Sequence, residues 1–535
     1  MPHGQRADRH SRTLSPVPSS QCYPVAMASP DTMPDPTIDT AAIDAALAAT
    51  VAGRVRGSVA NGIRTFLGIP YAAPPVGADR FQPPRPVAAW EGERDATTPG
   101  PCAPQRLRPF PGLDVAPLIG SDPVVGDDYL TLNVWAPVGA VNVPVMVFIH
   151  GGGFVLGSKD VSVSDGTGFA RSGIVCVAIN YRLGVDGFLP IPGVPTNLGL
   201  RDMLAALGWV KTNIANFGGN PANVTVFGES AGAMAIADLV SSPLAAGLFR
   251  RAIIESGHGS MVRDIGVAQR LVNKLARLLK IRPDAAGFAA PSRAALADAV
   301  EKVSAPTARL DLRDAAGHEP VFGISRFVPV FGDDVLPEPP VAALGKGAGA
   351  AIDVLIGTNS EEMRLYFVPT GVKQKMFGWL ARRFIGRANP HARAALKAYG
   401  LGQKGVAAGD AFTAALTDMV FRWPARIYAA AHQGRTHMYE FDWRSPASGG
   451  ELGACHGIEL PFVFDSLSTV TGPQGLAGEN PPQALANRMH KLWVDFATDG
   501  SLPWEEFNEQ TRLVYSLEKG VAVSEPVMPA APFLP

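Results

Sequence analysis

The segment Val224-Thr-Val-Phe-Gly-Glu-Ser-Ala-Gly232 is the clearest indication of this chain's fold. Its first four residues form an apolar, β-branched run of the kind found in buried parallel strands. The alanine-rich run that follows, from Ala231 to Val240, favours a helix. Between them stands G-x-S-x-G, and a strand, a sharp turn and a helix are the setting in which this pattern is a nucleophile elbow. We therefore predict that Ser230 projects from a tight turn, with the positive end of a helix beneath it.

Strands and helices alternate on both sides of this turn. Apolar residues at i, i+3 and i+4 predict a helix over 199–217. Apolar strands are expected at 143–150, 174–181, 251–255, 354–357 and 437–441. This order predicts an α/β fold with a mostly parallel central sheet and helices on both faces. Residues 262–335 and 365–435 have helix-rich compositions outside the alternation and are expected to be helical insertions.

No linker between Val51 and Pro503 would separate independent domains. We expect a disordered N-terminal extension over residues 1–45, one α/β domain over 46–520 and a C-terminal tail over 521–535. The first 40 or so residues are rich in Pro, Ser, Asp and Thr, and they lack the apolar core of a secretory signal. The predicted location is therefore the cytoplasm.

The composition narrows the classes of function. Hydrophobic residues make up 47% of the chain and charged residues 18%, which indicates a globular protein. Lys and Arg number 47 against 48 Asp and Glu, so the overall charge balance does not point to nucleic acid or to an anionic membrane. No apolar run approaches the roughly 18 residues that span a bilayer. We expect no nucleic-acid partner and no membrane span, and the oligomeric state stays open.

A second glycine motif supplies candidate oxyanion donors. His150-Gly-Gly-Gly-Phe154 directly follows an apolar strand. Consecutive glycines let backbone N–H groups turn into a pocket without side chains in the way. Together with the residue after the nucleophile, such a loop forms the oxyanion hole of serine hydrolases.

A serine nucleophile also needs a base, and with this elbow the chain order is serine, acid, histidine. His456 lies in a glycine-flanked loop before an apolar segment, which suits a catalytic loop. His258 follows Ser230 too closely to leave room for an acid between them. His437 falls within a predicted strand and His490 within a predicted helix, so both are interpreted as structural.

The acid is expected in the polar turn that ends the strand at 354–357. Glu361 and Glu362 are both plausible by position, and the spacing alone does not choose between them. Two solvated turn carboxylates with no catalytic role would look the same in the sequence.

With these residues in place, the chain resembles the type B carboxylesterases, which include para-nitrobenzyl esterases and the cholinesterases. The similarity runs from about Val51 to Leu517 and implies the α/β-hydrolase fold. It rests on the two glycine motifs above and on further matches at 66–71, 74–77, 80–81, 127–135, 180–184, 187–188, 197–202 and 217–221.

The resemblance implies a role for each site residue. It selects Glu362 over Glu361 as the acid, because the family uses the second acidic residue of a G-x-N-x-D/E-E stretch, and it makes His456 of the H-G-x-E segment the base. The oxyanion donors it implies are the backbone amides of Gly152, Gly153 and Ala231. It further implies that Ser256 supports the acid and that Arg80 and Asp127 form a structural ion pair.

The chain also departs from the family. Members often pair two cysteines near the start, and Cys102 fits the first position, but Tyr129 stands at the second. We therefore predict that Cys22, Cys102, Cys176 and Cys455 form no structural disulfide, in agreement with a reducing compartment. No equivalent of the aromatic choline site is found, so choline esters are not favoured.

The sequence thus predicts a serine carboxylesterase that acts on a small-molecule ester through an acyl-enzyme, with no metal and no cofactor. A stretch at 345–350 half-resembles a dinucleotide loop, but it precedes a strand instead of following one. Two alternatives stay open. One is a related hydrolase of carbamates, amides or lactones, and the other is a non-catalytic binding member of the superfamily.

Overall fold

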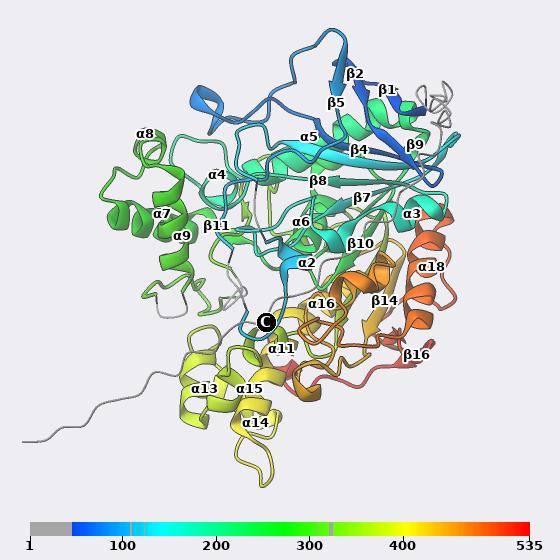
Figure 1. The fold of residues 1–535 in the computed structure, drawn as a ribbon. Helices are drawn as coiled ribbons and strands as arrows, with labels where there is room; N and C mark the ends of the chain where they lie inside the picture. Colours follow the sequence, from blue (N-terminus) through cyan, green and yellow to red (C-terminus); the bar gives the residue numbers. More distant parts are fainter. Residues whose placement is uncertain (1–44, 108–109, 122–123, 306–307, 320–324, 535) are drawn as a thin grey trace, which may run out of the picture. The chain divides into compact units, whose positions relative to one another are not determined.

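A computed structural model describes residues 45–107, 110–121, 124–305, 308–319 and 325–534. Its centre is an 11-stranded sheet (Figure 1). In sheet order the strands are β16 (Val521–Ser524), β15 (Leu513–Ser516), β14 (Thr436–Phe441), β13 (Asp353–Asn359), β10 (Arg251–Glu255), β9 (Gly219–Glu229), β7 (Val143–Ile149), β8 (Val175–Ile179), β6 (Thr131–Pro137), β4 (Ile63–Pro70) and β3 (Ser58–Ala60). Neighbours from β15 to β8 pair in parallel, and antiparallel pairs form both ends of the sheet.

Helices follow most of the parallel strands. They are α2 (Ala116–Ile119), α3 (Thr167–Arg171), α4 (Gly184–Phe188), α5 (Leu198–Asn213), α6 (Ala231–Ser241), α7 (Ile265–Leu279), α8 (Ala285–Ala289), α9 (Arg293–Ser304), α10 (Pro340–Gly345), α11 (Arg364–Phe367), α12 (Val372–Lys375), α13 (Gly378–Ile385), α14 (Ala392–Ala398), α15 (Ala408–Thr417), α16 (Trp423–Ala431), α17 (Leu460–Val463) and α18 (Gln483–Asp499). Two small sheets accompany them, one of β1 (Leu47–Ala49), β2 (Arg54–Arg56) and β5 (Glu93–Asp95), and one of β11 (Arg263–Asp264) and β12 (Val330–Phe331).

The buried strands contribute to a core on each face of the sheet. In β7, Val145 and Val147 belong to the core that also contains residues of α5 and α6, whereas Met146 and Phe148 belong to the core that contains residues of α3 and α18. Successive side chains of a strand point to opposite faces, so an unbroken apolar run is what a sheet covered on both sides requires. The predicted α/β-hydrolase fold, with helices on both faces, is therefore confirmed.

Helical insertions interrupt the alternation at two places. Helices α7 to α9 lie between β10 and β13, and helices α11 to α16 lie between β13 and β14. Helices α7 to α9 lie on the left of Figure 1, and α13 to α15 of the second insertion lie at its bottom. Both insertions were expected from their composition.

The predicted elements lie close to the observed ones. Strand β10 has the predicted bounds, and the helix expected over 199–217 is α5 followed by a short 3₁₀ helix, Ile214–Phe217. At the C-terminus, residues 521–535 were expected to be a tail, but Val521–Ser524 pair with β15 as an edge strand. The N-terminal extension lies outside the described residues, apart from Ala45. Among the described helices, none is both long and apolar enough to cross a membrane.

Candidate active site

The turn between β9 and α6 holds Ser230 in an unusual backbone conformation. Ser230 has φ 54° and ψ −123°, a positive φ that non-glycine residues rarely adopt. Its N–H donates to the Glu255 carbonyl of β10 at 2.9 Å. A Cβ at Gly232 would lie 1.9 Å from the Ile149 carbonyl oxygen, so the backbone of this turn packs too closely for any side chain there. The glycine of the motif is thus required by the approach of α6 to β7.

The structure brings the three residues predicted for a triad into one hydrogen-bonded chain. His456 Nε2 lies 2.8 Å from Ser230 Oγ, and His456 Nδ1 lies 2.7 Å from Glu362 Oε2. All three side chains are buried. An ionised carboxylate only accepts hydrogen bonds, so Nδ1 carries the hydrogen and the unprotonated Nε2 of a neutral imidazole can accept from the serine hydroxyl.

The two adjacent carboxylates of the polar turn have different surroundings. Glu362 is fully buried, and its second oxygen accepts the Asn359 N–H at 2.8 Å. Glu361 instead forms ion pairs with Arg364, at 2.9 Å, and with Arg444. Only one of the two therefore faces the imidazole.

Ser256 does not reach Glu362 in the way that the resemblance implied. It directly follows β10 with φ 53°, and its N–H donates to the Gly357 carbonyl. Its hydroxyl is buried and has no hydrogen-bond partner among the described residues. The support for the Glu362 carboxylate comes instead from the backbone N–H of Asn359.

The glycine loop after β7 presents unpaired N–H groups beside Ser230. Gly152 has φ 104°, and a Cβ there would lie 2.1 Å from the Leu156 carbonyl oxygen. Within the described residues, no group accepts a hydrogen bond from the N–H of Gly152 or Gly153, or from that of Ala231 in the first turn of α6. Ser325 Oγ lies 2.6 Å from the Gly153 carbonyl oxygen and holds the loop from outside. The sequence contains no motif that could have indicated Ser325.

Glu229, for which the sequence predicted no role, also contacts the imidazole of His456. Glu229 Oε1 lies 3.0 Å from His456 Nε2. Burial raises the pKa of Glu229 to about 7. Burial opposes protonation of His456, but the carboxylates of Glu229 and Glu362 outweigh it and raise the pKa of His456 to about 9. In the sequence, Glu229 occupies the variable position before the serine of G-x-S-x-G. An acidic residue next to the nucleophile was the only indication that it could reach the base.

A third carboxylate, Glu459, lies in the same buried region. Asn359 Nδ2 donates to Glu459 Oε2 at 2.5 Å and to the Cys455 carbonyl at 2.7 Å, so it joins β13 to the loop that carries His456. Burial, together with Glu229 and Glu362, raises the pKa of Glu459 to about 8. Both Asn359 and Glu459 stood in the matched motifs, but no role had been assigned to either.

The remaining histidines near the site have other partners. The ring of His258 is buried and donates from Nε2 to the Val420 carbonyl at 2.7 Å. His437 lies in β14 and His490 in α18, as predicted. Burial lowers the pKa of His150, at the start of the glycine loop, to about 4, so this ring is neutral near pH 7. None of these rings contacts Ser230, which leaves His456 as the base that the geometry allows.

A cavity of about 350 Å³ opens beside Ser230, His456 and the glycine loop. Its wall is mostly apolar, and α9 supplies Leu296 and Val300. Further apolar lining residues are Phe110, Leu118, Ile119, Val155, Leu156, Val161, Val163, Leu183, Val185, Leu365 and Leu460. A largely apolar cavity with a few convergent polar groups suits a small apolar ligand.

The resemblance implied an ion pair between Arg80 and Asp127, and this prediction is wrong, because each residue has another partner. Arg80 Nη2 binds Asp186 of α4 at 2.9 Å, and Nε of the same guanidinium binds the same carboxylate oxygen at 3.1 Å. Asp127 instead pairs with Arg293, the first residue of α9, at 2.5 Å. Two ion pairs thus form where one was expected, because α4 contributes Asp186 as the partner of Arg80 and α9 contributes Arg293 as the partner of Asp127.

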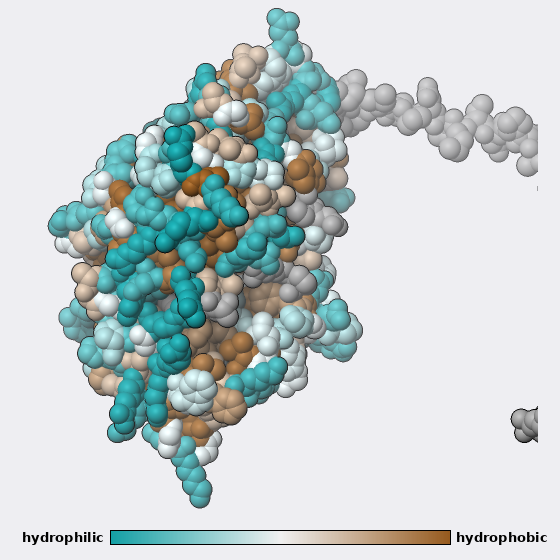
Figure 2. Space-filling view, turned by 90° about the vertical axis from the view of Figure 1, so that its left-hand side faces the viewer, coloured by the Kyte–Doolittle hydropathy of each residue, from teal (hydrophilic) through white to brown (hydrophobic). Residues whose placement is uncertain are grey.

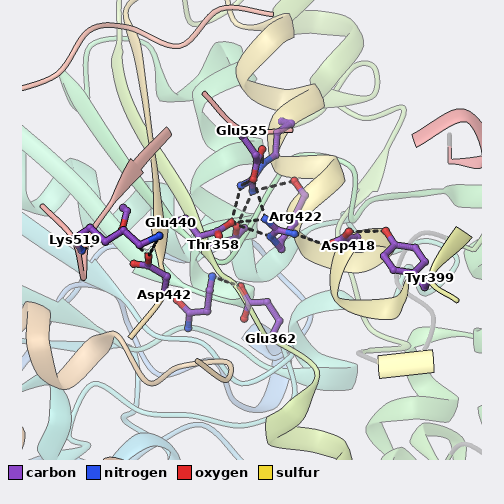
Figure 3. A network of polar contacts seen from close by, with 12 residues as sticks. Thr358, Glu362, Tyr399, Asp418, Arg422, Glu440, Asp442, Lys519 and Glu525 are labelled. Atoms are coloured by element: carbon purple, nitrogen blue, oxygen red, sulfur yellow. Dashed lines mark hydrogen bonds and ion pairs between the residues drawn. The ribbon is translucent and has the colours of Figure 1, made fainter. Parts of the chain in front are cut away.

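Behind the site lies a buried ionic network, drawn in Figure 3. Arg422 ends a π-helix, Asp418–Arg422, and binds Asp418 at 2.7 Å and Glu440 at 2.6 Å. Arg426 binds Glu525 through two nitrogens, at 2.7 and 2.9 Å, and donates to Thr358 Oγ1 at 2.7 Å. Thr358 precedes Asn359 in β13, so the C-terminal segment is tied to the strand that positions Glu362. The packing of the domain therefore continues beyond residue 520.

The same π-helix reaches the imidazole. The ring of Phe421 lies 4.7 Å from that of His456, centroid to centroid, and the ring of Tyr366 lies 5.6 Å from it. π-Helical turns occur often at functional sites. These two aromatic rings restrict the orientation of His456 and exclude water from it.

Cys102, Cys176 and Cys455 are buried and free, and Cys22 lies outside the described residues. In the part of the chain that the structure describes, no group of three or more His, Cys, Asp or Glu side chains is arranged to hold a metal ion.

Known proteins match this chain over most of its length. The Carboxylesterase family matches residues 44–528. The para-nitrobenzyl esterase of Bacillus subtilis (strain 168) is 34% identical over 479 residues, which cover 86% of this chain and 93% of that protein. The phenmedipham hydrolase of Pseudarthrobacter oxydans is 33% identical over 456 residues, which cover 82% of this chain and 87% of that one. A solved PNB esterase structure has a TM-score of 0.78 at 32% identity and covers 91% of this chain and 99% of its own.

Proposed function

Because this chain belongs to the carboxylesterase family, we propose that it hydrolyses small-molecule carboxylic esters through an acyl-enzyme on Ser230. In the first half-reaction Ser230 Oγ attacks the ester carbonyl carbon, and its proton passes to His456 Nε2. The amides of Gly152, Gly153 and Ala231 stabilise the negative charge that develops on the carbonyl oxygen.

The protonated imidazole then gives its proton to the leaving alkoxide, and the C–O bond to the alcohol breaks. Water attacks the acyl-enzyme in the second half-reaction, again with His456 as base, and the carboxylic acid is released. Glu362 keeps Nδ1 protonated and stabilises the imidazolium in both steps. The observation that carries this proposal is the hydrogen-bonded chain Ser230–His456–Glu362 beside unpaired N–H groups.

The apolar wall of the cavity supports a substrate that is apolar on both sides of the ester bond. The chemistry of the triad is shared with hydrolysis of carbamates, amides and lactones, so the shape of the cavity decides among them. The cytoplasm stays the predicted compartment, and free thiols at Cys102, Cys176 and Cys455 are compatible with it.

Labelling and a substrate panel test the proposal together. A sulfonyl fluoride should react at Ser230 and abolish hydrolysis of p-nitrophenyl esters, and mass spectrometry of the peptides should place the label on that residue. Ser230→Ala should prevent labelling and lower kcat by about 10⁴-fold or more while the melting temperature stays the same. Loss of activity with the label on another residue would overturn the assignment. Aryl esters, carbamates, amides and lactones, assayed side by side, rank the substrate classes.

A further inference from the structure

The segment from Met363 to Gly409, here called the basic insertion, has a one-sided charge. It contains nine Lys and Arg residues and no Asp or Glu, although the whole chain is nearly balanced at 47 against 48. The nine are Arg364, Lys373, Lys375, Arg382, Arg383, Arg387, Arg393, Lys397 and Lys404. By contrast, residues 262–335, which include α7 to α9, hold eleven basic and nine acidic residues. The overall charge balance therefore conceals a locally cationic surface.

Acidic residues outside the basic insertion neutralise only part of it. Lys373 pairs with Asp410 and Glu451, and Arg364 pairs with Glu361. Six of the cations are exposed and form no ion pair within the described residues, namely Lys375, Arg382, Arg383, Arg393, Lys397 and Lys404. A surface with several unpaired cations and no anion attracts polyanionic partners.

Two aromatic side chains project from the same surface. Phe377 and Trp379 have exposed fractions of 64% and 66%, and in the described part of the chain they are the only exposed aromatic residues. Helix α13 buries Ala381 and Ile385 against the rest of the protein. The exposed side of α13 therefore carries the aromatic ring of Trp379 as well as charged side chains.

The spacing along α13 places aromatic and cationic groups together. Arg382 and Arg383 follow Trp379 by three and four residues, and residues at these spacings share one side of a helix. Phe377 stands at the N-terminus of α13, and Lys375 precedes it by two residues. Figure 2, which views the molecule from the left-hand side of Figure 1, shows apolar and hydrophilic surface side by side at its lower end.

From these observations we infer that the basic insertion docks this protein onto an anionic lipid surface. Cations near such a surface are attracted to its headgroups. The amphipathic ring of tryptophan prefers the boundary between headgroups and acyl chains, where Phe377 can also bury its ring. A nucleic-acid duplex would use the cations but would leave the exposed aromatic side chains unexplained. This inference does not depend on the proposed esterase activity.

Co-sedimentation of the full chain with vesicles tests the inference. We expect binding to vesicles of phosphatidylcholine and phosphatidylglycerol, little binding to phosphatidylcholine alone, and release at high salt. Arg382→Glu/Arg383→Glu should weaken the binding about thirtyfold or more. Trp379→Ser should weaken binding to the same vesicles, because the apolar anchor is lost while the cations remain. Lys491→Glu/Lys519→Glu alters exposed lysines on α18 and near β16 by the same total charge, and it should bind like the unmodified chain.

A second measurement needs no variant. Brominated phosphatidylcholine in the anionic vesicles should quench part of the tryptophan emission of the unmodified protein, since Trp379 enters the bilayer boundary. Absence of both binding and quenching would overturn the inference. So would an equal loss in the Lys491→Glu/Lys519→Glu control, which would indicate a non-specific charge effect. Binding to duplex DNA that Trp379→Ser leaves unchanged, without vesicle binding, would replace the lipid surface by nucleic acid.

Discussion

Two buried clusters of charge meet at the end of β13, and they differ in their balance of positive and negative groups. The site cluster contains the carboxylates of Glu229, Glu362 and Glu459 around the single imidazole of His456. The arginine cluster is the part of Figure 3 in which Arg422 and Arg426 bind Asp418, Glu440 and Glu525. Thr358 belongs to the arginine cluster and Asn359 to the site cluster. Successive strand residues point to opposite faces, which separates the two clusters.

The two clusters show that burial alone does not set the protonation of a carboxyl group. In the site cluster, burial and mutual repulsion raise the pKa of Glu229 to about 7 and that of Glu459 to about 8. In the arginine cluster, burial also opposes ionisation, but the guanidinium groups of Arg426 and Arg422 outweigh it and lower the pKa of Glu525. Three carboxylates around one imidazole thus hold protons near neutral pH, as acid–base chemistry needs, whereas three carboxylates around two guanidinium groups stay ionised and hold the fold together.

The largest effect is expected from the carboxylate that orients the imidazole. Glu362→Gln should lower kcat by about 10³–10⁴-fold, because the amide no longer fixes the tautomer of His456. Glu361→Gln is the matched control, since that carboxylate pairs with Arg364 and Arg444, and it should lower kcat less than tenfold. Steady-state kinetics on one p-nitrophenyl ester measures both. Similar losses in the two variants would remove the distinction between the adjacent carboxylates.

The next effect concerns stability. Glu525→Gln should reduce the free energy of unfolding by about 1–3 kcal/mol, because it removes the carboxylate that binds Arg426 through two oxygens and leaves Glu440 as the remaining counter-ion of that guanidinium. Glu518→Gln, in the same C-terminal region but exposed, should change it little. Denaturant unfolding followed by circular dichroism measures the difference. If Glu525→Gln unfolded at the same denaturant concentration as the control, the arginine cluster would not stabilise the fold.

A smaller effect should appear in the pH dependence. His456 must be neutral to accept the serine proton, so kcat/KM should rise with pH through the pKa of His456, which the neighbouring carboxylates raise to about 9. Glu229→Gln removes one of these charges, so the rise should move to lower pH, and a charge at this distance shifts a pKa by about 1–3 units. Profiles of kcat/KM against pH for both proteins test this. A rise near the ordinary histidine value of about 6.5 in the unmodified enzyme would contradict the raised pKa.

The smallest effect is expected from reductant. A true disulfide typically contributes about 2–5 kcal/mol, whereas Cys102, Cys176 and Cys455 are free in the structure, so reduction should leave the melting temperature unchanged. Thiol titration of the denatured, unreduced chain should find four free thiols. A count of two would reveal a disulfide and would also contradict the predicted cytoplasmic location.

Much of the site could be predicted because its chemistry is carried by local patterns. The strand, turn and helix around Ser230 and the glycine loop at 151–153 each depend on a few consecutive residues, whose sizes are dictated by close backbone contacts. Glu362 was different, since the polar turn allowed Glu361 equally and only the resemblance to a family chose between them. The hydrogen bonds in the structure agree with that choice.

The α/β alternation, the elbow serine and the histidine loop could be predicted from the sequence, because hydrophobic periodicity and turn chemistry act over short distances. Three contacts became visible only in the folded chain: Arg80 pairs with Asp186, Glu229 contacts His456, and Glu525 binds Arg426. The last of these pairs joins residues 99 positions apart. Such contacts depend on how distant elements pack, and a charged side chain has several possible partners of equal chemistry until the fold brings one of them within reach.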